Sequence, residues 1–362
     1  MKILFCSEFY DPYIGGVEIH TKKLAEFFSK NNKVEIATSS IGSNIITKNY
    51  NNKKIKINRF DITGNLVKGY TGNISKYEKF LLNKKFDVIF FNAAQQWTFD
   101  LALPILENIN SKKIFFPCGF SRINNILYKP YYYLLQKKIN YFDVIICCSK
   151  DWQDYKFIKQ FYQKKIYIIN NGADNHKFKE IKFNKVITKK FLYVANIKYL
   201  KGQDRVIDIF EKIKKNSILF FIYSNKNNSL YKKYIFHKIK KFNISNKSNN
   251  KRVLTILNDN RITLKKYYLI SNAFISGSRL EYSPLVMYES LAAGIPYFGF
   301  DVGISNSIID KKFLGRISNK KNVLIKAINN YNFNKENKNL INKQFAKHYS
   351  WNKILKQYKK II

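Results

Sequence analysis

Carboxylates are scarce in this chain of 362 residues, which carries 24 Asp and Glu against 65 Lys and Arg, for a formal net charge of +41. A compositional bias toward Lys, Asn and Ile explains why Lys replaces Arg, but it does not explain the shortage of acids. The excess positive charge therefore indicates an anionic partner, which would be nucleic acid, acidic lipid headgroups or a phosphorylated substrate. Arg is scarce as well, and this disfavours nucleic acid, because base edges are read best by the bidentate guanidinium.

Long apolar runs and paired cysteines are also lacking. No stretch approaches the roughly 18 apolar residues of a membrane span, and the opening MKILFCSEFY reaches Glu8 too early for a signal peptide. The four cysteines show neither C-x-x-C nor metal-ligand spacing, so we expect reduced thiols and no metal site. The prediction is a cytoplasmic protein whose membrane contact, if any, is peripheral and on the inner face of the cell membrane.

Apolar residues make up 46% of the chain, enough for folded domains, and the length predicts two of them. Short continuous apolar runs alternate with helical patterns, which is typical of parallel sheets buried on both faces in an α/β protein. The predicted strands are Lys2–Cys6, Val34–Thr38, Val88–Phe91, Lys113–Phe116, Val144–Cys148 and Ile166–Ile169, then Phe191–Ala195, Ile218–Tyr223, Val253–Ile256, Ala273–Ile275 and Tyr297–Phe300. The polar, Lys-rich stretch Asp174–Lys190 separates the two series. We therefore predict domains over residues 1–175 and 176–345, followed by a C-terminal helix over 346–362.

The stretch SRLEYSPLVMYESLAAG, from Ser278 to Gly294, follows a predicted strand and contains two of the scarce carboxylates. Ser283 and Pro284 are typical of an N-cap followed by the first helical residue. The N–H groups of the first turn, around Leu285 and Val286, would then form an anion site suited to a diphosphate. Glu281 would lie in the loop before this turn and Glu289 nearly two turns into the helix. A nucleotide sugar needs this arrangement: N–H groups that donate hydrogen bonds to the diphosphate in the middle, and a carboxylate at each end that accepts hydrogen bonds from sugar hydroxyls.

With the Ala-Ala-Gly-Ile-Pro turn that ends at Pro296, this stretch resembles the E-x(7)-E motif of the family 4 glycosyltransferases of GT-B fold. The resemblance extends over nearly the whole chain. It implies that Glu289 holds the ribose of the donor and that Glu281 contacts the transferred hexose. It also implies two Rossmann-like, doubly wound parallel-sheet domains facing each other across a cleft, with the C-terminal helix crossing back to the first domain.

Three further segments match this family in part. Lys201, in a Lys-Gly pair after a predicted strand, matches the lysine that grips the donor diphosphate, whereas Asn196 stands where the family carries Arg. Asn supplies one neutral hydrogen bond and no charge. Gly15 and Gly16 resemble the Gly-Gly loop after the first strand, which lets the backbone approach the donor. Cys118 stands where many members carry His, and we interpret it as a small core residue.

The implied activity is transfer of a hexose from a nucleotide sugar to a glycan or lipid-linked acceptor, with retention of configuration, in polysaccharide or lipopolysaccharide biosynthesis. The chain lacks Asp-x-Asp, so we expect metal-independent transfer, with Glu281 and Lys201 as catalytic residues and no cofactor beyond the donor substrate. A nicotinamide cofactor is disfavoured because G-x-G-x-x-G is missing. The acceptor is expected to bind the first domain.

The segment Lys129–Ile139 has aromatic, apolar and basic residues at helical spacing. Tyr131, Leu134, Leu135 and Ile139 form its apolar stripe. One interpretation is contact with an anionic membrane surface; the other is a helix whose stripe faces the core.

Two other functions remain open. The departures at Asn196 and Cys118 allow a non-catalytic GT-B protein that only binds a nucleotide sugar. Charge alone favours a nucleic-acid binder, which we expect the protein not to be.

Overall fold

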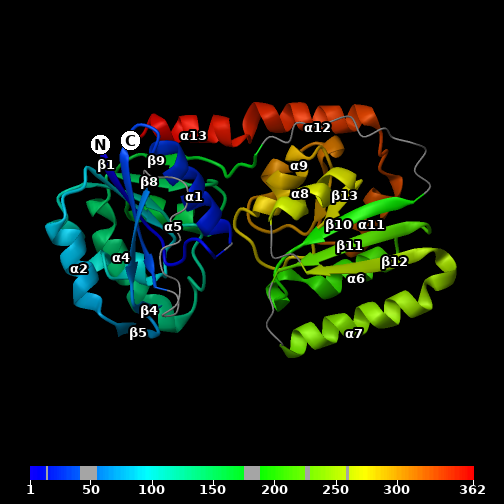
Figure 1. The fold of residues 1–362 in the computed structure, drawn as a ribbon, viewed down its shortest axis with the longest axis horizontal. Helices are drawn as coiled ribbons and strands as arrows, with labels where there is room; N and C mark the ends of the chain where they lie inside the picture. The colour runs from blue at the N-terminus through cyan, green and yellow to red at the C-terminus, as the bar shows by residue number, and fades with distance from the viewer. Residues whose placement is uncertain (14, 41–54, 175–187, 225–228, 258–260) are drawn as a thin grey trace. The chain divides into compact units, whose positions relative to one another are not determined.

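The computed structural model describes residues 1–13, 15–40, 55–174, 188–224, 229–257 and 261–362 (Figure 1). Contacts divide the chain into two compact units, the first comprising Met1–Asn170 with Ile354–Ile362 and the second comprising Asn171–Lys353. The division therefore falls a few residues before the predicted boundary at 175. Most of the predicted linker Asp174–Lys190 lies outside the described residues.

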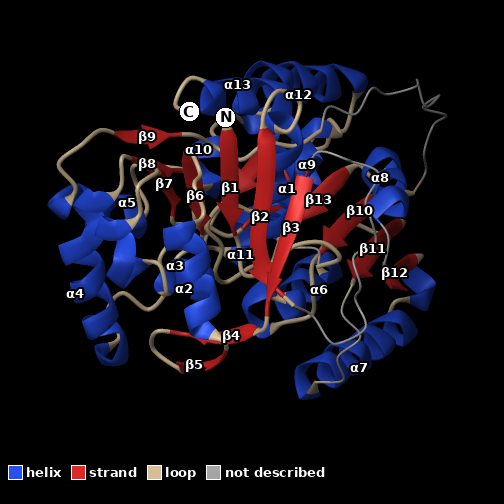
Figure 2. Ribbon diagram, turned by 60° about the vertical axis from the view of Figure 1, so that its left-hand side comes forward, coloured by secondary structure: helices blue, strands red, loops and turns tan. Residues whose placement is uncertain are grey.

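The first unit is built on a seven-stranded sheet in the order β3-β2-β1-β6-β7-β8-β9, in which every neighbouring pair is parallel. Figure 2 shows β1, β2 and β3 side by side in this sheet. Its strands are β1 (Lys2–Cys6), β2 (Lys33–Ser39), β3 (Ile55–Phe60), β6 (Val88–Asn92), β7 (Lys112–Phe116), β8 (Val144–Cys147) and β9 (Ile166–Ile168). Around it lie α1 (Gly16–Phe28), α2 (Ile74–Asn83), α3 (Trp97–Asp100), α4 (Lys129–Lys138), α5 (Gln153–Phe161) and the hairpin β4 (Ile62–Asn65) and β5 (Gly69–Gly72).

The second unit has a six-stranded parallel sheet in the order β12-β11-β10-β13-β14-β15. Its strands are β10 (Lys189–Val194), β11 (Ser217–Tyr223), β12 (Lys251–Leu257), β13 (Ala273–Ile275), β14 (Tyr297–Gly299) and β15 (Gly315–Ile317). Its helices are α6 (Gln203–Glu211), α7 (Leu230–Ser245), α8 (Arg261–Ile270), α9 (Leu285–Ala292), α10 (Ser305–Ile308), α11 (Lys321–Asn330), α12 (Lys335–His348) and α13 (Trp351–Lys359), the last of which continues into the first unit.

Every apolar run that the sequence pattern marks as a strand forms one, within two residues at each end. The central strands are covered on both faces, so their residues are almost all apolar; β8, for instance, is buried throughout. The pattern missed β3, the β4–β5 hairpin and β15. The strands β3 and β15 lie at the ends of their sheets, and half-exposed polar residues such as Asn58 and Arg59 break the apolar run of β3.

The chain ends in two helices, α12 and α13, separated at Tyr349 and Ser350. The helix predicted to begin near Ser350 corresponds to α13, whose residues from Ile354 onward belong to the first unit. There the hydroxyl of Tyr358 lies 2.9 Å from Nε2 of the buried His20, whose ring stacks on Phe116. The C-terminal residues are thus part of the first unit's core.

The amphipathic helix α4 packs its stripe inward. Tyr131, Leu135 and Ile139 are buried in the core of the first unit, and Leu134 packs against that core. The core-facing interpretation of the stripe is therefore correct, and the stripe itself cannot contact a membrane. Across the described residues, no helix combines the length and the apolar content that a membrane span requires.

Most of the lysines that the structure describes lie at the surface, but Lys251 at the start of β12 is buried. Its Nζ donates to the carbonyl oxygens of Phe210 at 2.8 Å, Glu211 at 2.9 Å and Ile213 at 2.8 Å. The first two carbonyls end α6 and the third lies just beyond its C-cap, where a helix has unpaired acceptors and a negative dipole end. Lys251 thus caps α6 from a neighbouring strand.

We predict that Lys251→Met lowers the free energy of unfolding by about 2 kcal/mol, because three carbonyl groups lose a charged donor. Chemical denaturation measures this change. Arg252→Met is the control, since Arg252 is the exposed neighbour on the same strand, and its effect should stay within about 0.5 kcal/mol. Equal losses in the two variants would contradict the capping role.

Candidate functional site

The loop that carries Glu281 leads into α9, which begins one residue later than predicted. Pro284, not Ser283, is the N-cap: its backbone is extended (φ −68°, ψ 118°), and no side chain caps the helix. The Ser283 hydroxyl instead lies 3.1 Å from the hydroxyl of Tyr288. The amides of Leu285 and Val286 open the helix, at positions whose N–H groups have no partner within the helix itself. The anion-binding character expected for this turn thus depends on main-chain groups alone.

Glu281 and Lys201 are adjacent in the structure. The Lys201 Nζ lies 2.6 Å from Glu281 Oε1, and the Ser278 hydroxyl donates to the same oxygen at 3.0 Å. The side chain of Glu281 is 14% exposed and that of Lys201 is 32% exposed. The two residues predicted as catalytic, 80 positions apart in sequence, therefore form one partly buried ion pair.

A close backbone contact between two loops brings this pair together. Lys201 ends a 3₁₀ turn, η4 (Tyr199–Lys201), and Gly202 after it has a left-handed backbone (φ 60°, ψ 41°). A Cβ on Gly202 would lie 1.9 Å from the carbonyl oxygen of Gly277, and a Cβ on Gly277 would lie 2.0 Å from the carbonyl oxygen of Gly202. Both positions therefore require glycine, and the loop after β10 can touch the loop after β13.

Arg279 and Asp204, which the sequence pattern did not identify as site residues, fasten the same two loops. Arg279 donates to both carboxylate oxygens of Asp204, at 2.9 and 2.5 Å, and to the carbonyl of Tyr199 at 2.9 Å. Its guanidinium also lies 4.0 Å from the centre of the Tyr199 ring. Burial raises the pKa of Asp204, but hydrogen bonds from Arg279 and Tyr231 outweigh it and lower the pKa to about 2. The only feature of the sequence that draws attention to Arg279 is that arginine is rare in this chain.

Glu289 lies in the middle of α9 and has its own partner. The hydroxyl of Tyr268 donates to Glu289 Oε2 at 2.9 Å, and the buried ring of Tyr268 stacks on Phe274 of β13. A donor at a fixed position restricts the orientation of the carboxylate, which is a hydrogen-bond acceptor through both of its oxygens. Tyr268 is a second residue that the sequence pattern did not single out.

Asn196 is hydrogen-bonded to the segment after β11 and to the start of α6. Its Oδ1 accepts a hydrogen bond from the Ser224 hydroxyl, and its carbonyl accepts one from Nε2 of Gln203 at 3.0 Å. Its amide nitrogen is the remaining side-chain donor, and it is neutral. Lys198, two residues on, is exposed.

Gly15 and Gly16 belong to the first unit, at the start of α1. Gly15 is the N-cap, and a Cβ there would lie 2.2 Å from Oε2 of Glu18, whereas a Cβ on Gly16 would meet nothing within 4 Å. The Glu18 carboxylate thus folds back over the helix start, where it interacts favourably with the helix dipole. Burial raises the pKa of Glu18. An anion approaching this turn would meet a carboxyl group as well as main-chain amides.

Cys118 follows β7 with a left-handed backbone (φ 57°), and burial raises the pKa of its thiol. Cys6, Cys147 and Cys148 are buried, and all four cysteines are free. Cys118 itself is only half-buried, so it borders the core and is not part of it as predicted. A thiol whose pKa is raised is a poor nucleophile.

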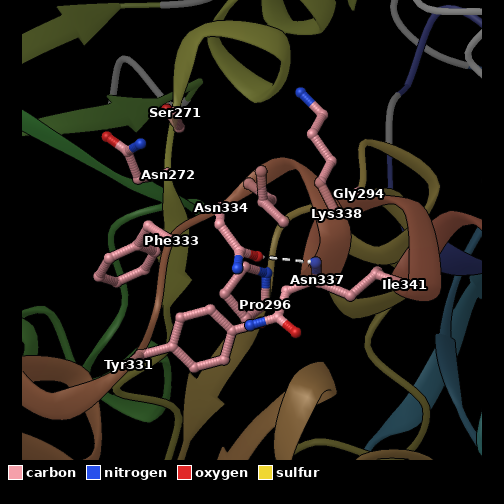
Figure 3. Close-up of a pocket in the computed structure, with 11 residues that line it drawn as sticks. Ser271, Asn272, Gly294, Pro296, Tyr331, Phe333, Asn334, Asn337, Lys338 and Ile341 are labelled. Atoms are coloured by element: carbon pink, nitrogen blue, oxygen red, sulfur yellow. Dashed lines mark hydrogen bonds between the residues drawn. The ribbon is translucent and has the colours of Figure 1, made fainter. Parts of the chain in front are cut away.

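A small pocket in the second unit lies away from these residues, at the opposite end of α9 (Figure 3). The Gly294–Pro296 turn, Tyr331, Phe333 and the first residues of α12 line it, and the Asn334 side chain caps that helix by accepting from the Asn337 amide at 2.8 Å. Ligands of parallel sheets bind beyond the carboxyl ends of the strands, whereas Pro296 immediately precedes β14. The pocket is therefore not part of the candidate site.

Residues 174–348, almost the whole second unit, match the model of the family described as glycosyl transferases group 1. This unit is therefore similar to the domain that defines that family. It contains Lys201, Glu281 and Glu289. No curated protein matches the chain in sequence.

Solved structures extend the likeness over the entire chain and show the GT-B fold. Sucrose-phosphate synthase from Thermosynechococcus elongatus is similar with a TM-score of 0.78 at 15% identity, over 99% of this chain and 98% of that one. HepE from Anabaena, solved with UDP-glucose, has a TM-score of 0.73 at 14% identity over 100% and 99%. WaaG, a glycosyltransferase involved in lipopolysaccharide biosynthesis, has 0.66 at 14% identity over 99% of both chains.

We predict that Gly202→Ala lowers the free energy of unfolding by about 3 kcal/mol, because the new Cβ would force the two loops apart at a strained φ. Gly69→Ala separates the two causes: Gly69 also has positive φ (84°), but its Cβ would meet nothing within 4 Å. Its loss should be about 1 kcal/mol. Similar losses in thermal and chemical denaturation would mean that the contact with Gly277 is unimportant.

The Asp204–Arg279 pair predicts a dependence of stability on pH. The pKa of Asp204 is about 2 in the folded protein, below its unfolded value of about 3.9. Its contribution of about 2 kcal/mol is therefore complete above pH 4 and is lost as the pH falls toward 2. Asp204→Asn should lose this contribution at neutral pH and show a flatter decline in acid. An unchanged acid profile in denaturation experiments would refute the assignment.

Proposed function

We propose that this protein is a glycosyltransferase that moves a hexose from a nucleotide-sugar donor to a glycan or lipid-linked saccharide, with retention of anomeric configuration. The observation that carries the proposal is the Lys201–Glu281 ion pair, in the loops beside the start of α9, within the unit that matches the group 1 glycosyltransferase model. This pair supports the proposal because a cation suits phosphate, a carboxylate suits sugar hydroxyls, and the two charged groups are adjacent.

The donor's diphosphate is the group best matched to the start of α9. The main-chain amides of Leu285 and Val286 supply donors, and Lys201 supplies positive charge. HepE has been solved with UDP-glucose, so UDP-hexoses are the first class of donor to test. Glu289, oriented by Tyr268, would accept the two ribose hydroxyls.

The ion pair has a role in the reaction as well as in binding. Two phosphate charges at the helix start would compete with Glu281 for Lys201, freeing the Glu281 carboxylate to accept hexose hydroxyls. As the bond from the anomeric carbon to the leaving phosphate breaks, negative charge grows on that phosphate, and the Lys201 ammonium stabilises it. A lysine and helix amides can perform this role without a metal ion, which supports metal-independent transfer.

Retention of configuration follows from the resemblance to family 4. Glu281 and Glu289 are assigned to the donor's hydroxyls, so neither is available to form a covalent sugar intermediate. We therefore propose attack from the face that the phosphate leaves, with that phosphate accepting the acceptor's proton.

A non-catalytic protein that binds a nucleotide sugar is the second candidate. Asn196 replaces a charged donor, and the Glu18 carboxylate at the start of α1 would repel a diphosphate there. Both features would weaken stabilisation of the leaving group. Measurement of transfer and donor hydrolysis separates the two candidates.

We predict that one class of nucleotide sugar raises the melting temperature of the protein, because a ligand of the folded state stabilises it. UDP-, GDP-, ADP- and dTDP-hexoses form the panel. Glu289→Gln should weaken binding of that donor by about 2 kcal/mol, roughly thirtyfold, through loss of its charged hydrogen bonds. Glu281→Gln should reduce the rate of transfer more than donor affinity.

Glu336→Gln is the control, because Glu336 is an exposed carboxylate on α12. It should change neither affinity nor rate. Donor binding without transfer or hydrolysis would favour the non-catalytic candidate. Failure of every nucleotide sugar to bind would refute both.

A further inference from the structure

The outward side of α4 differs from its buried stripe. The preceding 3₁₀ turn, η2 (Ile126–Tyr128), exposes Ile126 (73%) and Leu127 (71%), and Tyr133 (58%) and Tyr141 (42%) are exposed farther along. Tyr133, Lys137 and Tyr141 are spaced by four residues, which places them on one side of the helix and its extension. We call the exposed residues Ile126, Leu127, Lys129, Tyr133, Lys137 and Tyr141 the α4 ridge.

The charged residues of the ridge are all lysines, and one carboxylate, that of Glu107, hydrogen-bonds the Tyr141 hydroxyl at its end. Lys129 and Lys137 are exposed, and the sequence contains no Asp or Glu between Glu107 and Asp143. Glu107 itself is paired with Lys138 at 2.8 Å. The Lys137 ammonium lies 4.3 Å from the centre of the Tyr133 ring, so an exposed cation and an exposed aromatic ring form one unit.

Ile126 and Leu127 are consecutive residues at the start of the ridge, ahead of its aromatic rings and cations. A bilayer surface matches this order: aliphatic side chains enter the acyl boundary, tyrosines lie at headgroup level and lysines meet anionic lipids. We propose that the α4 ridge docks the protein on the surface of a bilayer that contains anionic lipids.

Other occupants fit less well. A second copy of the chain would bring a net charge of +41 against another of the same sign. Nucleic acid would satisfy the lysines but would leave the two aliphatic side chains in water, because its contacts are dominated by phosphate. The ridge therefore best matches a surface with anionic groups on the outside and an apolar layer beneath them.

The helix α7 is the strongest rival surface in the described part of the chain. It is also basic, and it exposes Leu230 (84%) and Ile244 (71%). These two residues are near opposite ends of the helix, about 21 Å apart along its axis, so they do not form one apolar tip. The adjacent pair on η2 is the better insertion point.

Docking would bring the acceptor-binding unit to a lipid-linked saccharide, and this purpose rests on the proposed function. Binding to vesicles does not rest on the proposed function, because it requires neither a sugar donor nor an acceptor. Failure of docking and failure of transfer are therefore separate results.

The experiment is co-sedimentation of the full chain with vesicles of neutral phosphatidylcholine, alone or with 30 mol% phosphatidylglycerol (about one lipid in three, chosen to give a clearly anionic surface). We expect binding to the anionic vesicles that weakens with salt and little binding to neutral ones. Ile126→Ser/Leu127→Ser and Lys129→Gln/Lys137→Gln should each reduce the partition coefficient by about tenfold or more. The substituted side chains are exposed, so the melting temperature and donor binding should not change.

The matched controls are on α7: Leu230→Ser/Ile244→Ser and Lys240→Gln/Lys241→Gln remove similar exposed side chains. They should retain wild-type binding. The proposal is wrong if the α7 variants lose binding and the α4 variants keep it, if all variants bind alike, or if the wild type ignores anionic vesicles at low salt. Displacement of the protein from vesicles by duplex DNA, with α4 variants that bind DNA less well but vesicles normally, would assign the ridge to nucleic acid instead.

Discussion

The contact between Gly202 and Gly277 is the constraint on which the candidate site depends. Because neither residue has a side chain, the loop after β10 and the loop after β13 can touch through their backbones. Lys201 and Glu281 then lie 2.6 Å apart, and Arg279 locks the same loops by binding Asp204. In a chain of net charge +41, two of the few carboxylates, Glu281 and Asp204, form ion pairs that hold these two loops together.

Electrostatics explains how the site could respond to a donor. Lys201 is neutralised by Glu281 as long as no stronger anion is near, and a diphosphate at the start of α9 would be that anion. The ammonium of Lys201 would then bind the phosphate, and the carboxylate of Glu281 would bind the sugar hydroxyls. In the first unit, Glu18 covers the start of α1, so the two helix starts are electrostatically different although both follow a strand of a parallel sheet.

The parallel sheets could be predicted because a strand covered on both faces must be apolar throughout, as β8 is. The sheet ends could not, because β3 mixes Asn58 and Arg59 with its apolar residues. Glu281, Glu289 and Lys201 could be named from spacing and resemblance, and they stay predictions as ligand-binding residues. Ser283 was misassigned as the N-cap, since an extended Pro284 takes that position. Tyr268 carries no motif and has a visible role only beside Glu289.

The sequence by itself determined the class of fold, the positive charge and which loops carry the candidate site residues. These features follow from local apolar runs, composition and turn residues. The tertiary structure decided which side chains meet. The Lys201–Glu281 and Arg279–Asp204 pairs join residues about 80 positions apart, and the direction in which α4 turns its two faces depends on the core it packs against. The local sequence pattern does not encode these contacts, because they depend on the packing of strands that are remote in sequence.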